Sequence, residues 1–251
     1  MKLWPLILVA GCGLPLLERS YPAPTKEVLL EAAQAHRRSV KSLRATAKVD
    51  QRTPTGRIKV KVELAFAASG KLRAEILSPL GGSAATLASD GESFVFFDRQ
   101  HSRFLSGPAC AENIVRFLQL AFTPQELSAL LAGSAPMVGG PSSSRWERRG
   151  GREVLELSAP DGSRETLVFD GKPTDRDLLW AERKTADGSL VWRVEHRQFE
   201  SGLPAITDVV QGKTKVSIRF RSREPNLDLP DELFRLQRPP GVLVETVDCG
   251  R

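Results

Sequence analysis

Cysteine and histidine are scarce in this sequence, and long apolar runs are almost absent. The chain has 3 Cys among 251 residues, which excludes a fold held together by many disulfides. Its 3 His (His36, His101 and His196) lie far apart, which argues against a zinc site built from several histidines. A phosphate-binding loop, a nucleophile elbow and a dinucleotide fingerprint are all missing. We therefore expect no metal, no cofactor and no enzymatic activity.

The composition is that of a folded protein. Hydrophobic residues make up 41% and charged residues 26%, with a formal net charge of +6. These values are close to globular averages, and a chain of this length can bury a sizeable core. Since no internal repeat is visible, we expect a single domain over residues 26–251, although residues 133–144 are where a boundary would fall.

The first twelve residues have the pattern of a secretion signal. Lys2 supplies a positive charge, and the uncharged run from Leu3 to Gly11 is far shorter than the roughly 20 residues of a membrane-spanning helix. The segment Val9-Ala10-Gly11-Cys12 resembles the lipobox of bacterial lipoproteins. That resemblance implies cleavage before Cys12 and attachment of lipid to its sulfur. The alternative is a buried N-terminal strand with an incidental cysteine.

The residue after this cysteine indicates the destination membrane. Gly13 stands where lipoproteins retained in the inner membrane carry Asp, so the resemblance implies a lipid-anchored protein on the periplasmic face of the outer membrane. Residues 1–11 are then a lipoprotein signal peptide. Residues 12–25, which are rich in proline, form a lipidated tether.

The body of the chain is dominated by alternating apolar and polar residues. A helical period extends from Lys26 to Leu43, with Thr25 as a plausible N-cap. Alternation then predicts antiparallel strands separated by Pro/Gly turns, at residues 43–49, 58–66, 72–77, 83–88, 94–97 and 103–105.

Two short helices interrupt this series of strands near the middle of the chain. They are predicted at residues 111–120 and 124–131, with Thr123 as N-cap and Pro124 at the first position of the second helix. Further strands are predicted at residues 145–149, 152–158, 164–169, 178–185, 190–199, 206–211 and 214–222, and a last helical turn at 230–234. We expect a mainly β fold, an open antiparallel half-barrel of about eleven or twelve strands with a helical lid.

Four segments of the first half resemble the LolA/LolB superfamily of lipoprotein carriers and receptors. They are Leu72–Gly81, Leu87–Gly91, Phe104–Ala109 and Leu118–Gly133. The resemblance implies an incomplete barrel whose helices cover an apolar cavity. The lipobox favours the lipidated receptor, LolB, because the carrier LolA is not lipidated. This implies a protein that accepts acyl chains of client lipoproteins and helps insert them in the outer membrane, with a soluble periplasmic carrier as a candidate partner.

Large apolar residues on the inward face of the predicted strands are candidates to line this cavity. They alternate with alanines that leave room beside them, and they are Ile58, Val60, Leu64, Phe66, Leu72 and Ile76. The alternative is that the same residues fill a dry core, because most alternating apolar faces do. The protein would then be a structural or assembly lipoprotein whose half-barrel serves as a scaffold for a protein partner.

The turn Pro79-Leu80-Gly81 matches a motif of the receptor family. The order of Ser78, Pro79 and Gly81 suits a type I turn and places Leu80 at its tip. In that family a Leu in this turn protrudes and assists insertion of the client into the membrane, so the resemblance gives Leu80 this role. The alternative is that Leu80 folds back onto its own sheet.

Two cysteines and two basic runs complete the candidates. Cys110 and Cys249 could pair in an oxidising periplasm, but sequence alone leaves their geometry open. The runs Arg145–Arg152 and Arg219–Arg223 have the charge of nucleic-acid footprints. Alternation predicts that Arg219, Arg221 and Arg223 share one strand face, which is expected to be solvated or to face anionic lipid head groups. Nucleic acid is not expected as a partner in the periplasm, and we expect a monomer.

Overall fold

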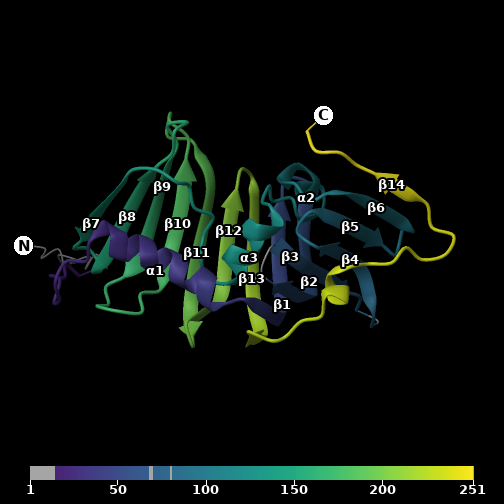
Figure 1. Ribbon diagram of the computed structural model, residues 1–251, viewed down its shortest axis with the longest axis horizontal. Helices are drawn as coiled ribbons and strands as arrows, with labels where there is room; N and C mark the ends of the chain where they lie inside the picture. The colour runs from purple at the N-terminus through teal and green to yellow at the C-terminus, as the bar shows by residue number, and fades with distance from the viewer. Residues whose placement is uncertain (1–14, 68–69, 80, 251) are drawn as a thin grey trace, which may run out of the picture.

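The computed structural model describes residues 15–250 except residues 68, 69 and 80 (Figure 1). The predicted signal peptide, Cys12 and Leu80 therefore lie outside the described residues. In the described part, no helix is both long enough and apolar enough to cross a membrane.

Fourteen strands make up one sheet within the described residues. Their bounds are β1 (Ser42–Thr53), β2 (Gly56–Ala67), β3 (Lys71–Leu77), β4 (Ser83–Ser89), β5 (Ser93–Asp98), β6 (Arg103–Pro108), β7 (Ser142–Glu147), β8 (Arg152–Ser158), β9 (Arg164–Asp170), β10 (Leu178–Lys184), β11 (Leu190–Glu200), β12 (Leu203–Gln211), β13 (Thr214–Pro225) and β14 (Val244–Thr246).

Two antiparallel meanders are joined side by side in this sheet, the first formed by β1–β6 and the second by β7–β13. The strand order is β14-β6-β5-β4-β3-β2-β1-β13-β12-β11-β10-β9-β8-β7, so β1 and β13 pair across the middle. β14 pairs with β6 in parallel, whereas the other neighbouring pairs are antiparallel. The two edges, β14 and β7, lie at opposite ends of the molecule in Figure 1. The predicted open antiparallel half-barrel is confirmed, with more strands than the eleven or twelve expected.

Alternation along the strands decides which side chains are buried. In β1, Ala45 and Ala47 are buried while Arg44 and Lys48 are exposed. β2 follows through the two-residue turn that separates the paired Thr53 and Gly56. One buried apolar cluster extends from these strands to β8, β9 and β11, on the side of the sheet that the helices cover. A sheet this long cannot bury a face against itself, so helices are needed on that side.

Three α-helices cover the sheet: α1 (Lys26–Ser39), α2 (Ala111–Leu118) and α3 (Pro124–Leu131). α1 lies across the β7–β12 half (Figure 1) and buries Leu29 and Ala33 completely. It ends at Ser39, four residues before the predicted Leu43, because Leu43 already pairs with Phe66 of β2. The predicted N-cap of α3 is confirmed, with Thr123 and Glu126 forming a reciprocal capping box.

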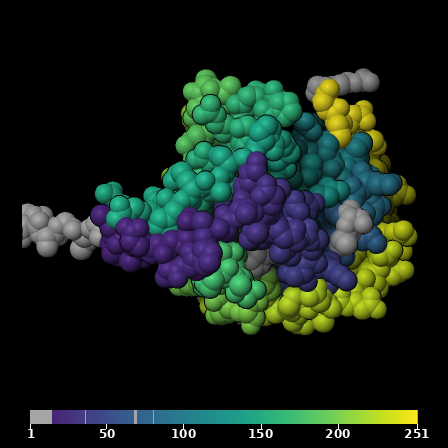
Figure 2. Space-filling model, turned by 60° about the vertical axis from the view of Figure 1, so that its left-hand side comes forward, coloured from purple at the N-terminus to yellow at the C-terminus, as the bar shows by residue number. Residues whose placement is uncertain are grey.

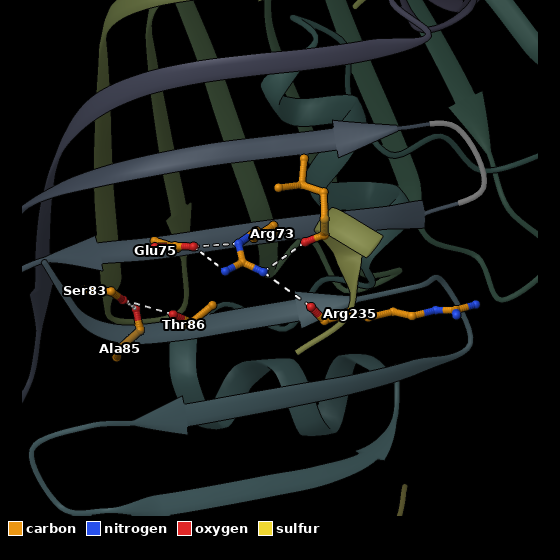
Figure 3. A network of polar contacts seen from close by, with 7 residues as sticks. Arg73, Glu75, Ser83, Ala85, Thr86 and Arg235 are labelled. Carbon is orange, nitrogen blue, oxygen red and sulfur yellow. Dashed lines mark hydrogen bonds and ion pairs between the residues drawn. The ribbon is translucent and has the colours of Figure 1, made fainter. Parts of the chain in front are cut away.

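The C-terminal tail returns to the first meander. It includes a 3-10 helical turn, η2 (Asp231–Phe234), where a helical turn was predicted. Figure 3 shows how the tail is fixed to the polar face of β3: the Arg73 guanidinium donates to the carbonyl of Leu233 at 2.9 Å and to that of Arg235 at 3.5 Å. Glu75 on the same strand accepts from Arg73 Nε at 2.6 Å and so orients the guanidinium.

Candidate functional site

An apolar cavity of about 170 Å³ lies between the sheet and the helical pair α2 and α3, which we call the lid. The sheet side comes from β1–β5, β12 and β13. Its lining residues are Val49, Gln51, Val60, Val62, Leu64, Leu72, Ala74, Ile76, Ala85, Leu87, Phe96, Phe117, Leu118, Leu120, Leu127, Leu130, Leu131, Val209, Val216 and Ile218. Gln51 is the one polar residue among them, so the cavity can hold hydrocarbon but offers little to a polar ligand.

Four of the six predicted cavity residues line this space, namely Val60, Leu64, Leu72 and Ile76. The other two lie elsewhere on β2. Ile58 is near the turn into β2, beyond the cover of the lid, and its side chain is 56% exposed. Phe66, at the other end of the strand, is buried in the packed core. The cavity is thus confined to the middle of the strand.

The lid side of the cavity comes from both short helices. Phe117 of α2 stacks on Phe96 of β5 with ring centroids 4.1 Å apart, and Leu127, Leu130 and Leu131 of α3 complete the roof. These helices were predicted from the sequence, but the residues that face the cavity were not. The amphipathic spacing of Ile114, Phe117 and Leu118 indicates the inward face of α2.

Two glutamines of the sheet bind the connection between α2 and α3. The Gln51 side chain donates to the Leu118 carbonyl at 2.8 Å. The Gln211 side chain accepts from the Ala121 backbone N–H at 2.6 Å. The first bond satisfies a carbonyl that the end of α2 leaves without a helical partner, because Gln119 adopts a left-handed conformation there. The second satisfies a backbone N–H of the connection itself. The connection is therefore tied to the sheet by two side chains.

A disulfide joins Cys110, at the start of α2, to Cys249 in the tail. Asn113 also donates to the Pro108 carbonyl at 2.9 Å, so the first turn of α2 is tied to β6 as well. Glu112 lies close to both sulfurs. This group cannot act as a thiolate metal site while the disulfide is intact, because the metal ligand is the free thiolate.

The turn between β3 and β4 is tight and solvent-facing. The Gly81 N–H donates to the Ser78 carbonyl at 3.1 Å, and the Ser78 N–H donates to the Gly82 carbonyl at 2.9 Å. Pro79 and Gly81 are exposed, and Gly81 has φ of 96°, which favours glycine. Pro79 borders a depression on the polar face of β1, β2 and β13. The role predicted for the turn stays a prediction, because Leu80 lies outside the described residues.

The segment of residues 15–21, which we call the N-terminal segment, lies along the β7–β8 hairpin at one edge of the sheet (Figure 2). The Gly150 N–H donates to the Pro15 carbonyl at 2.9 Å, and the Leu17 N–H to the Arg148 carbonyl at 2.7 Å. Trp146 Nε1 donates to the Leu17 carbonyl at 3.0 Å. The chain therefore enters the fold at this edge.

A buried ion pair holds the same segment. Arg19 donates two hydrogen bonds to the Glu153 carboxylate, at 2.8 and 3.0 Å, and the Tyr21 hydroxyl donates a third at 3.0 Å. Glu153 is 1% exposed. Burial, and then the bond to Glu153, raise the pKa of Tyr21. This site was not predicted, because Arg19 and Glu153 are far apart in the sequence and no local pattern links them.

Two further polar residues are buried beneath the chain that follows α3. His196 lies between the Thr207 hydroxyl and the Ser134 carbonyl, each 3.0 Å from a ring nitrogen. Glu165 accepts from the Val138 N–H at 2.9 Å, and its other oxygen has no hydrogen-bond partner among the described residues. Burial raises the pKa of Glu165 to about 7. Both groups hold residues 134–138 against the second meander.

Neither a family model nor a curated protein matches this sequence. Solved structures do resemble the fold. A LolA superfamily protein from Nitrosomonas europaea is 15% identical with a TM-score of 0.55, covering 85% of this chain and 99% of its own. A putative outer membrane lipoprotein-sorting protein domain from Vibrio parahaemolyticus is 12% identical with a TM-score of 0.57, covering 83% and 97%.

A DUF1329 family protein from Desulfovibrio piger is also similar, at 11% identity and a TM-score of 0.57, covering 85% of this chain and 98% of its own. At such identities the likeness defines the fold. The chain has the fold of the LolA superfamily, an open sheet with helices over its apolar side. The resemblance carried by the sequence segments is thereby confirmed at the level of the fold.

Proposed function

We propose that this protein binds the acyl chains of lipoproteins in the cavity under the lid and helps to insert its clients in the outer membrane, as a LolB-type receptor. The observation that carries the proposal is the apolar space between the sheet and the lid. The fold supports it, because the Vibrio parahaemolyticus protein of similar fold is a putative outer membrane lipoprotein-sorting protein domain.

The physical need for such a cavity is large. An acyl chain of about 16 carbons costs on the order of 10 kcal/mol when it is exposed to water. The cavity of about 170 Å³ is smaller than the roughly 300–1,000 Å³ of ligand pockets. The lid must therefore move away from the sheet when a chain enters. Transfer into the membrane needs no nucleotide and no catalysis, because the chain moves to a more apolar environment.

Lipid attachment at Cys12 would hold the protein at the membrane, as its lipobox resemblance implies. Pro15, where the N-terminal segment binds the sheet, is three residue steps from Cys12, and these steps span at most about 11 Å. The membrane anchor would then emerge close to the β7–β8 hairpin. In the same proposal the turn at Leu80 assists insertion, and a soluble periplasmic carrier delivers the client.

A scaffold function is the competing proposal, and the small size of the cavity favours it. The discriminating experiment is native purification of the full-length protein followed by mass spectrometry for bound lipid or lipoprotein. We expect acyl-bearing cargo with the wild type. The variant Ala74→Phe fills the cavity and should retain less than about a tenth of that cargo, at a stability cost of about 1–3 kcal/mol.

The matched control for this experiment is Ile58→Phe. It adds a ring on the neighbouring strand at an exposed position outside the cavity, so cargo should be retained. Wild-type protein that purifies without any acyl-bearing molecule would contradict lipoprotein binding and leave the scaffold. Equal cargo in Ala74→Phe and the wild type would show that the lipid binds somewhere else.

A further inference from the structure

Three cations lie directly opposite one another on the polar face of the sheet. Lys48 of β1 pairs in register with Lys61 of β2 on one side and with Arg219 of β13 on the other. All three side chains are exposed, and we call them the cationic row. Like charges in opposite positions of neighbouring strands are destabilising. Their presence at the centre of the sheet therefore calls for an explanation other than stability.

Acidic groups do not neutralise the cationic row. Among the described residues, none of its three members has a carboxylate within ion-pairing distance of 4.0 Å. Two acids lie on this face two residues from the row, Asp50 beside Lys48 and Glu63 beside Lys61, and neither forms an ion pair with it. Asp50 is bound by Arg57, which holds the pKa of that carboxyl below its usual value. The row thus presents uncompensated positive charge to whatever approaches this face.

The cationic row borders a depression of about 730 Å³. Two more exposed cations, Lys59 and Arg221, line it as well. Arg221 is the extra residue of a bulge in β13, where Thr46 and Ala47 oppose Ser222 and Phe220. The bulge separates it from Arg223, which is paired with Glu200. Five cations therefore converge on one hollow of the polar face.

The Ser78–Pro79 end of the β3–β4 turn forms another wall of this depression. An exposed turn beside a cationic hollow is the combination that favours a lipid surface, where anionic head groups meet apolar insertion. A protein partner is less favoured, because interface cores are depleted of lysine and enriched in aromatic residues. The residues lining the depression include three lysines and no aromatic side chain.

We propose that the cationic row and the depression beside it bind the phosphate groups of an anionic phospholipid surface. This inference rests on the proposed function. It adds which face of the sheet meets the membrane during client insertion. The other basic run fits this role less well, because Arg145 is paired with Glu156 and Arg148 with Glu18. This pairing leaves fewer cations available to phosphate groups in that run.

Vesicle binding by the full-length chain carrying Cys12→Ser tests this proposal without a lipid anchor. Vesicles of phosphatidylcholine are compared with vesicles of equal parts phosphatidylcholine and phosphatidylglycerol. We expect binding to the anionic vesicles only, and its loss as salt rises toward 1 M, where screening shortens to about 3 Å. The apolar N-terminal residues are common to every variant, so only differences between variants and between lipids are scored.

The variant Lys48→Gln/Lys61→Gln/Arg219→Gln should weaken anionic binding on the order of 100-fold, because each cation near an anionic surface contributes about five-fold. Its melting temperature should equal or exceed that of the wild type, because like-charge repulsion is removed. The matched control Arg164→Gln/Lys213→Gln/Arg238→Gln removes three exposed cations elsewhere and should bind like the wild type. The charge-preserving variant Lys48→Arg/Lys61→Arg should also keep binding.

Equal binding to neutral and anionic vesicles would overturn the proposal, as would equal losses in the triple variant and its control. Displacement by inorganic phosphate, beyond the effect of chloride at the same ionic strength, would assign the hollow to a soluble phosphate and overturn it too. Cargo binding under the lid is measured separately by mass spectrometry. Lipid cargo in a protein that does not bind anionic vesicles would therefore refute only this inference and leave the proposed function intact.

Discussion

Glu165 is a buried carboxylic acid whose surroundings favour its neutral form. It is 1% exposed, and one of its oxygens lacks a hydrogen-bond partner among the described residues. Burial raises its pKa from 4.5 to about 7. As pH rises from about 4.5 to 7, the unfolded chain loses its proton before the folded protein does. The folded state therefore loses stability over this window, by at most about 3 kcal/mol.

Replacement by the neutral isostere should remove this pH dependence. In Glu165→Gln the side-chain oxygen still accepts from Val138, but no charge has to be buried above the raised pKa. The stability of the variant relative to the wild type should rise between pH of about 4.5 and 7 and then level off. Urea unfolding across this range measures the difference. A difference that stays constant across this range would contradict the prediction.

Alternation of apolar and polar residues predicts on which side of the sheet a site residue lies, but not its place along the strand relative to the lid. Alternation places Val60, Leu64, Leu72 and Ile76 on the inward face, where they line the cavity. It cannot tell that Ile58 extends beyond the lid, since that depends on where α2 and α3 lie. The pairing of Cys110 with Cys249 was left open for the same reason: it depends on distances that only the folded chain provides.

The lid is attached at two places, its beginning and the connection between its two helices, and the two attachments differ. Its beginning is held covalently by the disulfide at Cys110. The connection between its two helices is held without a covalent bond, by the side chains of Gln51 and Gln211 and by packing of the buried Leu120 and Phe122. Each hydrogen bond contributes only about 0.5–1.5 kcal/mol net, so the connection is held more weakly than the disulfide-bonded beginning. Opening of the cavity should therefore begin there.

Removal of one of these side chains should make the connection open more often. In Gln211→Ala the Ala121 N–H loses its acceptor, and its hydrogen exchange should become about five-fold faster for each kcal/mol lost. Native-state exchange measured by mass spectrometry over residues 119–123 tests this. The control Gln237→Ala changes an exposed glutamine in the tail and should leave the segment unchanged. Unaltered exchange in Gln211→Ala would show that packing alone holds the connection.

The elements themselves follow closely from local sequence. Period-two runs between Gly and Pro turns give the long strands, and the Thr123–Glu126 capping box marks the start of α3. β14 was not predicted, because its three residues are exposed and show no alternation. The end of α1 was placed too late, since its apolar period continues into residues that pair with β2 and β13 instead.

The whole molecule depends on contacts that no local pattern specifies. The pairing of β1 with β13 joins the two meanders into one sheet. The contact of the N-terminal segment with the β7–β8 hairpin, at the edge of the sheet opposite β14 (Figure 1), also joins residues far apart in the sequence. While this contact holds, the chain from Cys12 to its fixed point at Pro15 spans at most about 11 Å. If the contact is released, the fixed point becomes the start of α1, and the chain from Cys12 to it can span about 45 Å. In the proposed lipid-anchored protein, this contact therefore sets how far the body can lie from the membrane.

The buried carboxylate of Glu153 should control that release. In Glu153→Gln the Arg19 guanidinium loses its charged partner, and breaking a buried pair typically costs about 3–5 kcal/mol. Trypsin should therefore cleave the full-length variant after Arg19 at least ten-fold faster than the wild type, while the rest of the chain stays intact. The control Glu18→Gln breaks only the exposed pair with Arg148 and should cleave slowly. Equal cleavage in Glu153→Gln and the wild type would mean that backbone bonds to the hairpin suffice, and that the ion pair does not set the reach of the anchor.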